Sequence, residues 1–185
     1  LHTLNPRRHP DQVVYIADHA EDTVLFFDLT FLPLVAAVAP RTKSVRHWVA
    51  MTDRAHLPAD AAAKIPNLLV YEDLIEGQDD KYAWPSFDEN TASSLCYTSG
   101  TTGNPKGVLY SHRSTVLHAY AAAMPDALNC GAADSILPVV PMFHANAWSL
   151  PYVGCMVGAK LVFPGAGLDG KSLYELFASE RVTLS

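Results

Sequence analysis

The chain has 185 residues, of which 49% are hydrophobic and only 17% are charged. This composition excludes an intrinsically disordered chain, and the length is sufficient to bury a hydrophobic core as one domain. The 13 basic residues are outnumbered by 19 acidic ones, and the net charge of −6 argues against a nonspecific nucleic-acid binder. A small anion can still bind to such a protein, because a local loop supplies its own positive groups.

The two ends of the chain suggest a piece of a longer protein. The sequence begins at Leu1 rather than at Met, and it ends in the apolar run 182–185, which resembles an unfinished strand. We therefore expect a truncated segment. A removed signal peptide would also explain the missing Met, but nothing in the sequence supports one.

The cysteines indicate a reducing environment. Cys96, Cys130 and Cys155 are odd in number and widely spaced, and they form no zinc-type pair. No N-glycosylation motif occurs either. We expect a cytoplasmic protein in which these thiols are small core residues.

Two apolar stretches, 24–39 and 136–163, were considered as membrane segments. Both contain prolines together with charged or polar residues, and neither supplies the ~18 uninterrupted apolar residues that a spanning helix needs. We predict no membrane-spanning segment. A surface anchor formed by 136–163 remains an alternative.

The first half of the chain alternates between predicted helices and strands. Helical apolar spacing occurs in 10–21 and 32–38, and short apolar strands are predicted at 23–27, 45–51 and 68–70. Residues 52–66 and 77–90 are polar or rich in alanine and proline, and they are predicted to be loops.

The second half continues the alternation. Strands are predicted at 94–97 and 107–110, followed by a helix over 113–128 that Ser111 or Ser114 caps and that Pro125 kinks or ends. Further strands are predicted at 136–140, 160–163 and 182–185, with helices at 146–157 and 173–178. This order predicts an α/β fold with a largely parallel sheet that helices cover on both faces.

The loop between the strands at 94–97 and 107–110 concentrates chemically useful residues. Its glycines let backbone N–H groups approach a ligand, its hydroxyls can bind phosphate oxygens or a divalent cation, and Lys106 adds a positive charge. Gly107 stands where a P-loop has a hydroxyl residue, and the glycines do not have dinucleotide-fold spacing. A plain Ser/Thr/Gly-rich turn is the alternative, but the density of these groups favours a polyphosphate site.

This loop resembles the phosphate-binding motif of the adenylate-forming enzymes, which include acyl-CoA synthetases, the adenylation domains of peptide synthetases and firefly luciferases. The matching segment is YTSGTTGNPKGV, residues 97–108. A second segment, PVVPMFHANAW at 138–148, is similar to that of medium- and long-chain fatty-acyl-CoA synthetases, as is the opening LHTLNPR. The resemblance covers the whole chain. It implies part of the large N-terminal, AMP-binding domain of an acyl-CoA synthetase-like fold, without the small C-terminal domain.

The resemblance implies a reaction in two steps. A medium- or long-chain fatty acid attacks the α-phosphorus of ATP to form an acyl-adenylate, and the thiol of coenzyme A then displaces AMP. Charge neutralisation on the triphosphate, supported by Mg²⁺, is the main physical requirement of the first step. The expected partners are these small molecules, with no nucleic acid and no integral membrane segment, and a homodimer is left open.

The resemblance also assigns roles to individual residues. His144 and Lys106 would be catalytic, with His144 near the carboxylate and the α-phosphate. Ala145 would line the adenylate pocket, and Trp148 would gate the acyl tunnel. Thr98 would help to hold Mg²⁺. The residues expected to bind the phosphates are Thr98, Ser99, Gly100, Thr101, Thr102, Gly103, Lys106 and Gly107. His144 and Trp148 are four residues apart, so we expect them to share one side of a helical turn. Without the resemblance, both would be interpreted as core residues.

Several expected parts of such an enzyme have no match in the sequence. The downstream segment whose Glu completes the Mg²⁺ site and the lysine of the C-terminal domain are both missing, so we expect the segment alone to be inactive. Two other functions stay open. One is a ligase for a short-chain or aryl acid, and the other is a nucleotide-binding module without catalysis.

Overall fold

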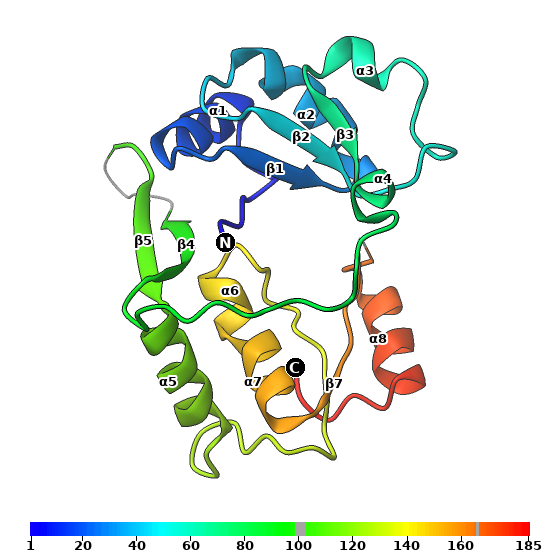
Figure 1. Cartoon of the computed structure of the whole chain (residues 1–185). Coiled ribbons are helices and arrows are strands. Elements are labelled where there is room, and N and C mark those ends of the chain that lie inside the picture. The colour runs from blue at the N-terminus through cyan, green and yellow to red at the C-terminus, as the bar shows by residue number, and fades with distance from the viewer. Residues whose placement is uncertain (99–102, 166) are drawn as a thin grey trace. The chain divides into compact units, whose positions relative to one another are not determined.

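The computed structural model describes residues 1–98, 103–165 and 167–185, which form two compact units (Figure 1). The first unit contains residues 4–86 together with 103–105. The second contains residues 1–3, 87–98 and 106–185.

A three-stranded parallel sheet organises the first unit. Its strands β1 (Val24–Phe27), β2 (His47–Ala50) and β3 (Leu68–Val70) are adjacent in chain order, as the apolar runs predict. The helical segments are α1 (Pro10–His19), η1 (Leu29–Phe31), α2 (Leu32–Val38), η2 (Ala39–Arg41), α3 (Ala61–Lys64) and α4 (Tyr71–Ile75). The prediction of a loop over 52–66 was wrong at α3, because three alanines with high helix propensity form one turn there and bury Ala61.

One face of this sheet carries the core of the unit. Trp48 is only 1% exposed, and it belongs to a cluster with Phe27 and with Val13 and Val35 from helices α1 and α2. Side chains of adjacent strand residues point to opposite faces. Phe26, next to Phe27, is accordingly exposed, so the helices cover the two faces unequally.

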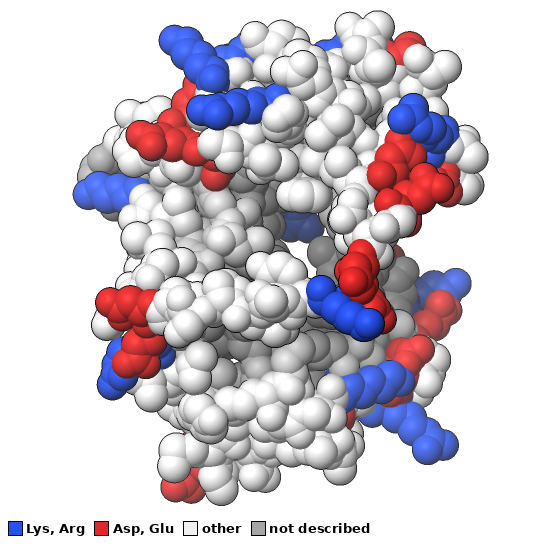
Figure 2. All heavy atoms as spheres, viewed as in Figure 1, with Lys and Arg blue, Asp and Glu red and all other residues white. Residues whose placement is uncertain are grey.

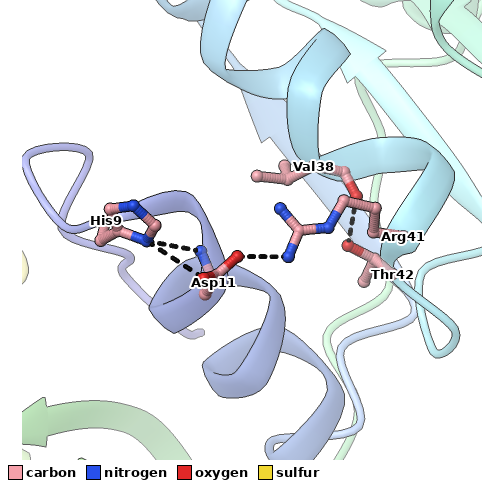
Figure 3. A network of polar contacts seen from close by, with 5 residues as sticks. All are labelled: His9, Asp11, Val38, Arg41 and Thr42. Carbon is pink, nitrogen blue, oxygen red and sulfur yellow. Dashed lines mark hydrogen bonds and ion pairs between the residues drawn. The ribbon is translucent and has the colours of Figure 1, made fainter.

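Polar contacts connect α1 to η2, the segment that follows α2 (Figure 3). The Arg41 guanidinium forms an ion pair with Asp11, and the ring Nδ1 of His9 accepts a hydrogen bond from the Asp11 backbone N–H at 3.3 Å. The Thr42 hydroxyl donates to the Val38 carbonyl at 2.9 Å, where the helix ends. The hydrogen bond from Arg41 lowers the pKa of Asp11.

An antiparallel hairpin begins the second unit. Strands β4 (Ala92–Thr98) and β5 (Lys106–Ser111) pair so that Thr98 lies opposite Lys106, which departs from the predicted parallel arrangement because the short loop joins them directly. Helix α5 (His112–Ala123) follows, and Ser111 and Ser114 form a reciprocal capping box at its start. The helix ends just before Pro125, which confirms that this proline ends it, because a residue before proline, here Met124, avoids the helical conformation. The apolar spacing up to residue 128 is therefore not helical throughout.

The rest of the second unit packs around a small parallel pair of strands, β6 (Ser135–Ile136) and β7 (Lys160–Leu161). A bridge from Leu184 to Ile136 supports the predicted closing strand. Its remaining helices are α6 (Ala145–Trp148), α7 (Leu150–Val157) and α8 (Gly170–Ser179). Ile136 and Val153 are fully buried in its core, so the apolar stretch 136–163 supplies core residues, which argues against its use as a surface anchor.

The apolar stripe of α5 does not face this core. The helix packs on α7 through Ala119, Ala122 and Ala123, whereas the predicted stripe leaves its large side chains exposed. The exposed members are Val116, Leu117, Tyr120, Met124 and Leu128.

The strands and helices confirm the predicted α/β class. Figure 2 shows basic side chains beside acidic ones over the face drawn, without a continuous basic stripe. In the described parts of the chain, no helix combines the length and the apolar character needed to cross a membrane.

Candidate functional site

The end of the β4–β5 hairpin exposes two of the predicted phosphate ligands. Thr98 ends β4 and is paired with Lys106, the first residue of β5, and both side chains are exposed. The Thr98 hydroxyl donates to the Lys106 carbonyl at 3.4 Å. Within the described ranges, no acidic side chain forms an ion pair with Lys106, so its ammonium group is available to an anion.

The loop between these residues is described only in part. Ser99, Gly100, Thr101 and Thr102, which we predict to bind phosphate, lie outside the described residues. Gly103 has a φ of +115°, a conformation that residues with a side chain rarely adopt, and no described atom lies within 4 Å of its Cβ position. A glycine at this position suits a loop whose backbone approaches a ligand.

Packing across the hairpin explains why residue 107 is a glycine. A Cβ at this residue would lie 3.1 Å from Cδ1 of Leu95 and 3.2 Å from Cζ of Tyr97, across the hairpin. These contacts are tighter than ordinary van der Waals distances. Gly107 therefore lets the two strands pack closely, and a contact with phosphate remains a prediction.

Residues 145–149 form a left-handed turn. Their φ values lie between 46° and 63°, although none of them is a glycine. The predicted helix 146–157 is therefore right-handed only from Leu150, where α7 begins. Because left-handed backbone costs about 1–2 kcal/mol per residue for L-amino acids, this turn stores strain of the kind that collects at functional sites.

The turn brings His144 and Trp148 together. Their ring centroids are 6.5 Å apart with an interplanar angle of 53°. The expectation that they share one side of a helical turn is supported, but the predicted right-handed helix was wrong here. Trp148 is 57% exposed and His144 is also exposed, while Ala145 is half-buried. Neither aromatic ring is thus a core residue of the described chain.

Contacts at the base of β4 connect the hairpin to this turn. The Cys96 thiol, two residues before Thr98, lies 3.9 Å from Oδ1 of Asn146, to which it donates. The Thr3 hydroxyl lies 3.8 Å from the same thiol, and it donates to the Met142 carbonyl at 2.9 Å. The second unit therefore connects the strand that carries Thr98 to the segment that carries His144 and Trp148.

Two residues of this region were not predicted from the sequence. Asn146 is 3% exposed in the middle of the turn, and its residue type, which tolerates positive φ, was the only available signal. Burial raises the pKa of Tyr152, and the electrostatic effect of the neighbouring Cys96 adds a smaller contribution in the same direction. Its phenol therefore stays neutral across the physiological range.

His112 and Arg113 have structural partners in the segment that precedes α5. Arg113 forms an ion pair with Glu89 at 2.6 Å, and its backbone N–H donates to the Glu89 carbonyl at 2.8 Å. The His112 ring lies 4.7 Å from that of Phe87. These contacts fix the start of α5 against the preceding segment.

Among the described residues, the hairpin offers an exposed oxygen donor that could contribute to binding a metal ion. Across residues 1–98, 103–165 and 167–185, no group of three or more His, Cys, Asp or Glu is arranged to hold a metal ion. Mg²⁺ commonly takes only one or two protein ligands and completes its shell with phosphate oxygens and water. The exposed Thr98 hydroxyl beside Lys106 fits that role next to a bound polyphosphate.

Comparison with known proteins gives one consistent result. The model of the AMP-binding enzyme family matches residues 1–185. Over 184 residues, 59% are identical to a medium-chain-fatty-acid–CoA ligase of Ectopseudomonas oleovorans, covering 100% of this chain and 33% of that protein. A 3-methylmercaptopropionyl-CoA ligase of Ruegeria lacuscaerulensis is 56% identical, again over 100% of this chain and 34% of the relative.

Solved structures share the fold at low sequence identity. A luciferase from Phrixothrix hirtus superposes with a TM-score of 0.80 at 20% identity, covering 98% of this chain and 34% of that one. The anthranilate-CoA ligase AuaEII, solved with anthranoyl-AMP, gives a TM-score of 0.79 at 23% identity over 96% of this chain and 33% of that one. The chain thus spans about a third of the length of the proteins that it matches.

Proposed function

Because the chain belongs to the AMP-binding enzyme family, we propose that it is part of the N-terminal domain of an ATP-dependent acid–CoA ligase. The acid is a medium- or long-chain fatty acid, which the enzyme joins to AMP and then transfers to coenzyme A. The observation that carries this proposal is the 59% identity to a medium-chain-fatty-acid–CoA ligase along the full chain. The 185 residues alone are expected to be inactive.

The hairpin end is the proposed phosphate site. Lys106 neutralises phosphate charge, and the Thr98 hydroxyl together with the phosphates holds Mg²⁺, which supplies further charge neutralisation. The motif residues from Ser99 to Gly103 and Gly107 complete this proposal. The exposed ammonium group of Lys106, which forms no ion pair with a described residue, and the positive φ of Gly103 support it.

The left-handed turn is the proposed acid site. His144 lies next to the reacting carboxylate and orients it by a hydrogen bond, Ala145 lines the adenylate pocket through its backbone, and Trp148 borders the entrance for the acyl chain. The close approach of the two rings and their exposure support this arrangement. Binding in this geometry would hold the carboxylate for in-line attack and exclude water from the mixed anhydride.

Acid-dependent exchange between pyrophosphate and ATP, measured on the full-length protein over a series of acid chain lengths, tests this function. We expect the highest exchange with a medium or long fatty acid. No exchange with any such acid would contradict the substrate assignment. ATP binding without exchange for any acid would instead favour the nucleotide-binding module.

A ligase for a shorter acid is the second candidate. Its support is the 56% identity to a 3-methylmercaptopropionyl-CoA ligase, which is nearly as high as the 59% identity to the medium-chain-fatty-acid–CoA ligase. The same exchange series distinguishes the two, because a shorter acid would then give the higher kcat/KM. Aryl acids are included in the series for the same reason.

Replacing Trp148 tests the acyl entrance separately. In the full-length protein, Trp148→Ala should change the ratio of kcat/KM between long and short acids by about tenfold, since an aromatic wall discriminates by size. The ratio is measured by pyrophosphate exchange, with Trp84→Ala as a control of the same residue type. An equal loss with every acid would argue against a gate.

We also propose a cytoplasmic location and a homodimer. Cys96, Cys130 and Cys155 are all free thiols, which supports a reducing compartment. Cell fractionation tests the location, and sedimentation of the full-length protein tests the dimer.

A further inference from the structure

The stability of the fold does not explain why Asn146 has a buried side-chain amide. Its Oδ1 accepts a weak hydrogen bond from the Cys96 thiol at 3.9 Å, whereas its Nδ2 has no partner among the described residues. An N–H group that is buried without an acceptor destabilises the fold. A glycine would adopt the same positive φ without this cost.

The position of Asn146 suggests what the amide does. It lies between His144 and Trp148 in chain order, and its side chain is directed toward Cys96 of β4, the strand that ends at Thr98. The neighbouring Ala147 is completely buried, so the middle of the turn is fixed in the core while both aromatic rings are exposed. The amide therefore connects the fixed part of the turn to the phosphate-binding strand.

We propose that Asn146 is a positioning residue, whose buried carboxamide holds the left-handed turn against β4 and thereby sets His144 and Trp148 relative to the phosphate site. This inference rests on the proposed function. Asn146 does not need to touch substrate, and it acts through the two rings. Misplacement of a reacting group by about 1 Å lowers enzymatic rates about 100-fold, so a small rotation of the turn is sufficient for a large effect.

The variant Asn146→Gly in the full-length protein distinguishes the effect of the side-chain amide from the effect of the backbone conformation. It keeps the positive φ accessible and removes only the carboxamide. We expect kcat for pyrophosphate exchange to fall by about tenfold or more and KM for the acid to rise, with KM for ATP unchanged within about twofold. Asn129→Gly is the matched control, because Asn129 also has a positive φ (49°) but is exposed and does not belong to the turn.

A second measurement is independent of activity. The emission of Trp148, obtained by subtracting the spectrum of a Trp148→Phe counterpart, should shift and become easier to quench with acrylamide in Asn146→Gly. Asn129→Gly should leave it unchanged. If the unsubstituted protein shows no exchange with any acid, the proposed function fails, and this emission alone decides whether Asn146 positions the turn.

Three results would overturn the inference. They are wild-type kinetics in Asn146→Gly, an unchanged Trp148 emission, and an equal rise of KM for acid and ATP together with a lower melting temperature. If Asn146→Gly does not fold, Cys96→Ala removes the other partner of the contact. Cys96→Ala should then change KM for the acid and the Trp148 emission in the directions expected for Asn146→Gly. Wild-type behaviour of Cys96→Ala would also reject the proposal.

Discussion

The parallel sheet of the first unit and the hairpin of the second are built from similar apolar strands, but they use their residues differently. In β2, Trp48, Val49 and Ala50 are all buried, whereas the first four residues of β5 are exposed and Leu109 is 64% exposed. Side chains of the sheet strands thus form part of a hydrophobic core. The hairpin instead leaves Thr98 and Lys106 exposed at its end, where we propose the phosphate site.

The two regions also differ in backbone strain. The parallel strands and their helices have ordinary geometry, while the segment after His144 takes five positive φ values in succession. Strain of this kind persists only where surrounding contacts impose it. The difference indicates that the first unit mainly provides stability, whereas the second places particular side chains. Four predictions test this division of roles.

The largest expected effect is on stability and concerns the sheet. Trp48→Ala should lower the free energy of unfolding by about 3–5 kcal/mol, because it leaves a large cavity in the core of the first unit. Urea unfolding of the full-length protein measures this change. Trp148→Ala should cost less than about 1 kcal/mol. Equal losses for the two tryptophans would remove the distinction between the regions.

The next effect is on activity and concerns the hairpin. Lys106→Ala should lower kcat/KM for ATP by about 100-fold, since a charged group that stabilises the transition state is lost. Pyrophosphate exchange measures it. Lys64→Ala, which removes an exposed lysine that pairs with Asp60 at 2.6 Å in the first unit, is the control and should leave exchange unchanged. A similar loss for both variants would mean that the lysine at the hairpin has no special role.

A smaller effect is expected from crowding within the hairpin. Gly107→Ala places a Cβ 3.1 Å from Leu95, and it should cost about 1–2 kcal/mol because the neighbours have to shift. Gly170→Ala is matched to it, because no atom of the described residues lies within 4 Å of that Cβ position. Melting temperatures of the two variants should therefore differ, and identical values would show that the hairpin is not closely packed.

The smallest effect depends on pH and returns to the first unit. Burial opposes ionisation of Asp18, but hydrogen bonds from Ser44 and Lys43 outweigh it and lower the pKa of the carboxyl. The backbone N–H groups of these two residues donate to Asp18 at 2.9 and 2.7 Å.

A lowered pKa in the folded state stabilises the protein above the unfolded pKa of about 3.9, and this contribution is lost as the pH falls through the folded value. Asp18→Asn should therefore lower the melting temperature at about pH 6, and the difference from the unsubstituted protein should shrink below about pH 4. Thermal unfolding at several pH values measures this. A difference that does not change with pH would exclude the carboxylate charge as its cause.

Much of the first unit could be predicted because its pattern is local. The apolar runs at 23–27, 45–51 and 68–70 contain all three strands, and the helical spacing of 10–21 contains α1. The single turn α3 could not be predicted by periodicity, because four residues do not complete a pattern. The unequal covering of the sheet faces depends on tertiary packing and has no sequence signal.

The sequence names residues for the site, and their roles stay predictions, whereas the geometry of the turn that carries two of them was not predicted. The rings of His144 and Trp148 were expected on one side of a turn, but a spacing of four residues is the same in a left- and a right-handed turn. The apolar stripe of α5 predicted a buried face, whereas small alanines make the contact with α7. Periodicity identifies a helix here, but which of its faces is buried depends on the neighbouring elements.

The left-handed turn has a consequence for chirality. Its backbone is the mirror image of ordinary helical backbone, so D-residues would occupy it without strain. A semisynthetic protein with D-alanine in place of Ala145, where φ is 46°, should keep the backbone path that the natural L-residue adopts only at a cost. In this segment the L configuration of the natural amino acids is less suited to the backbone than the D configuration would be.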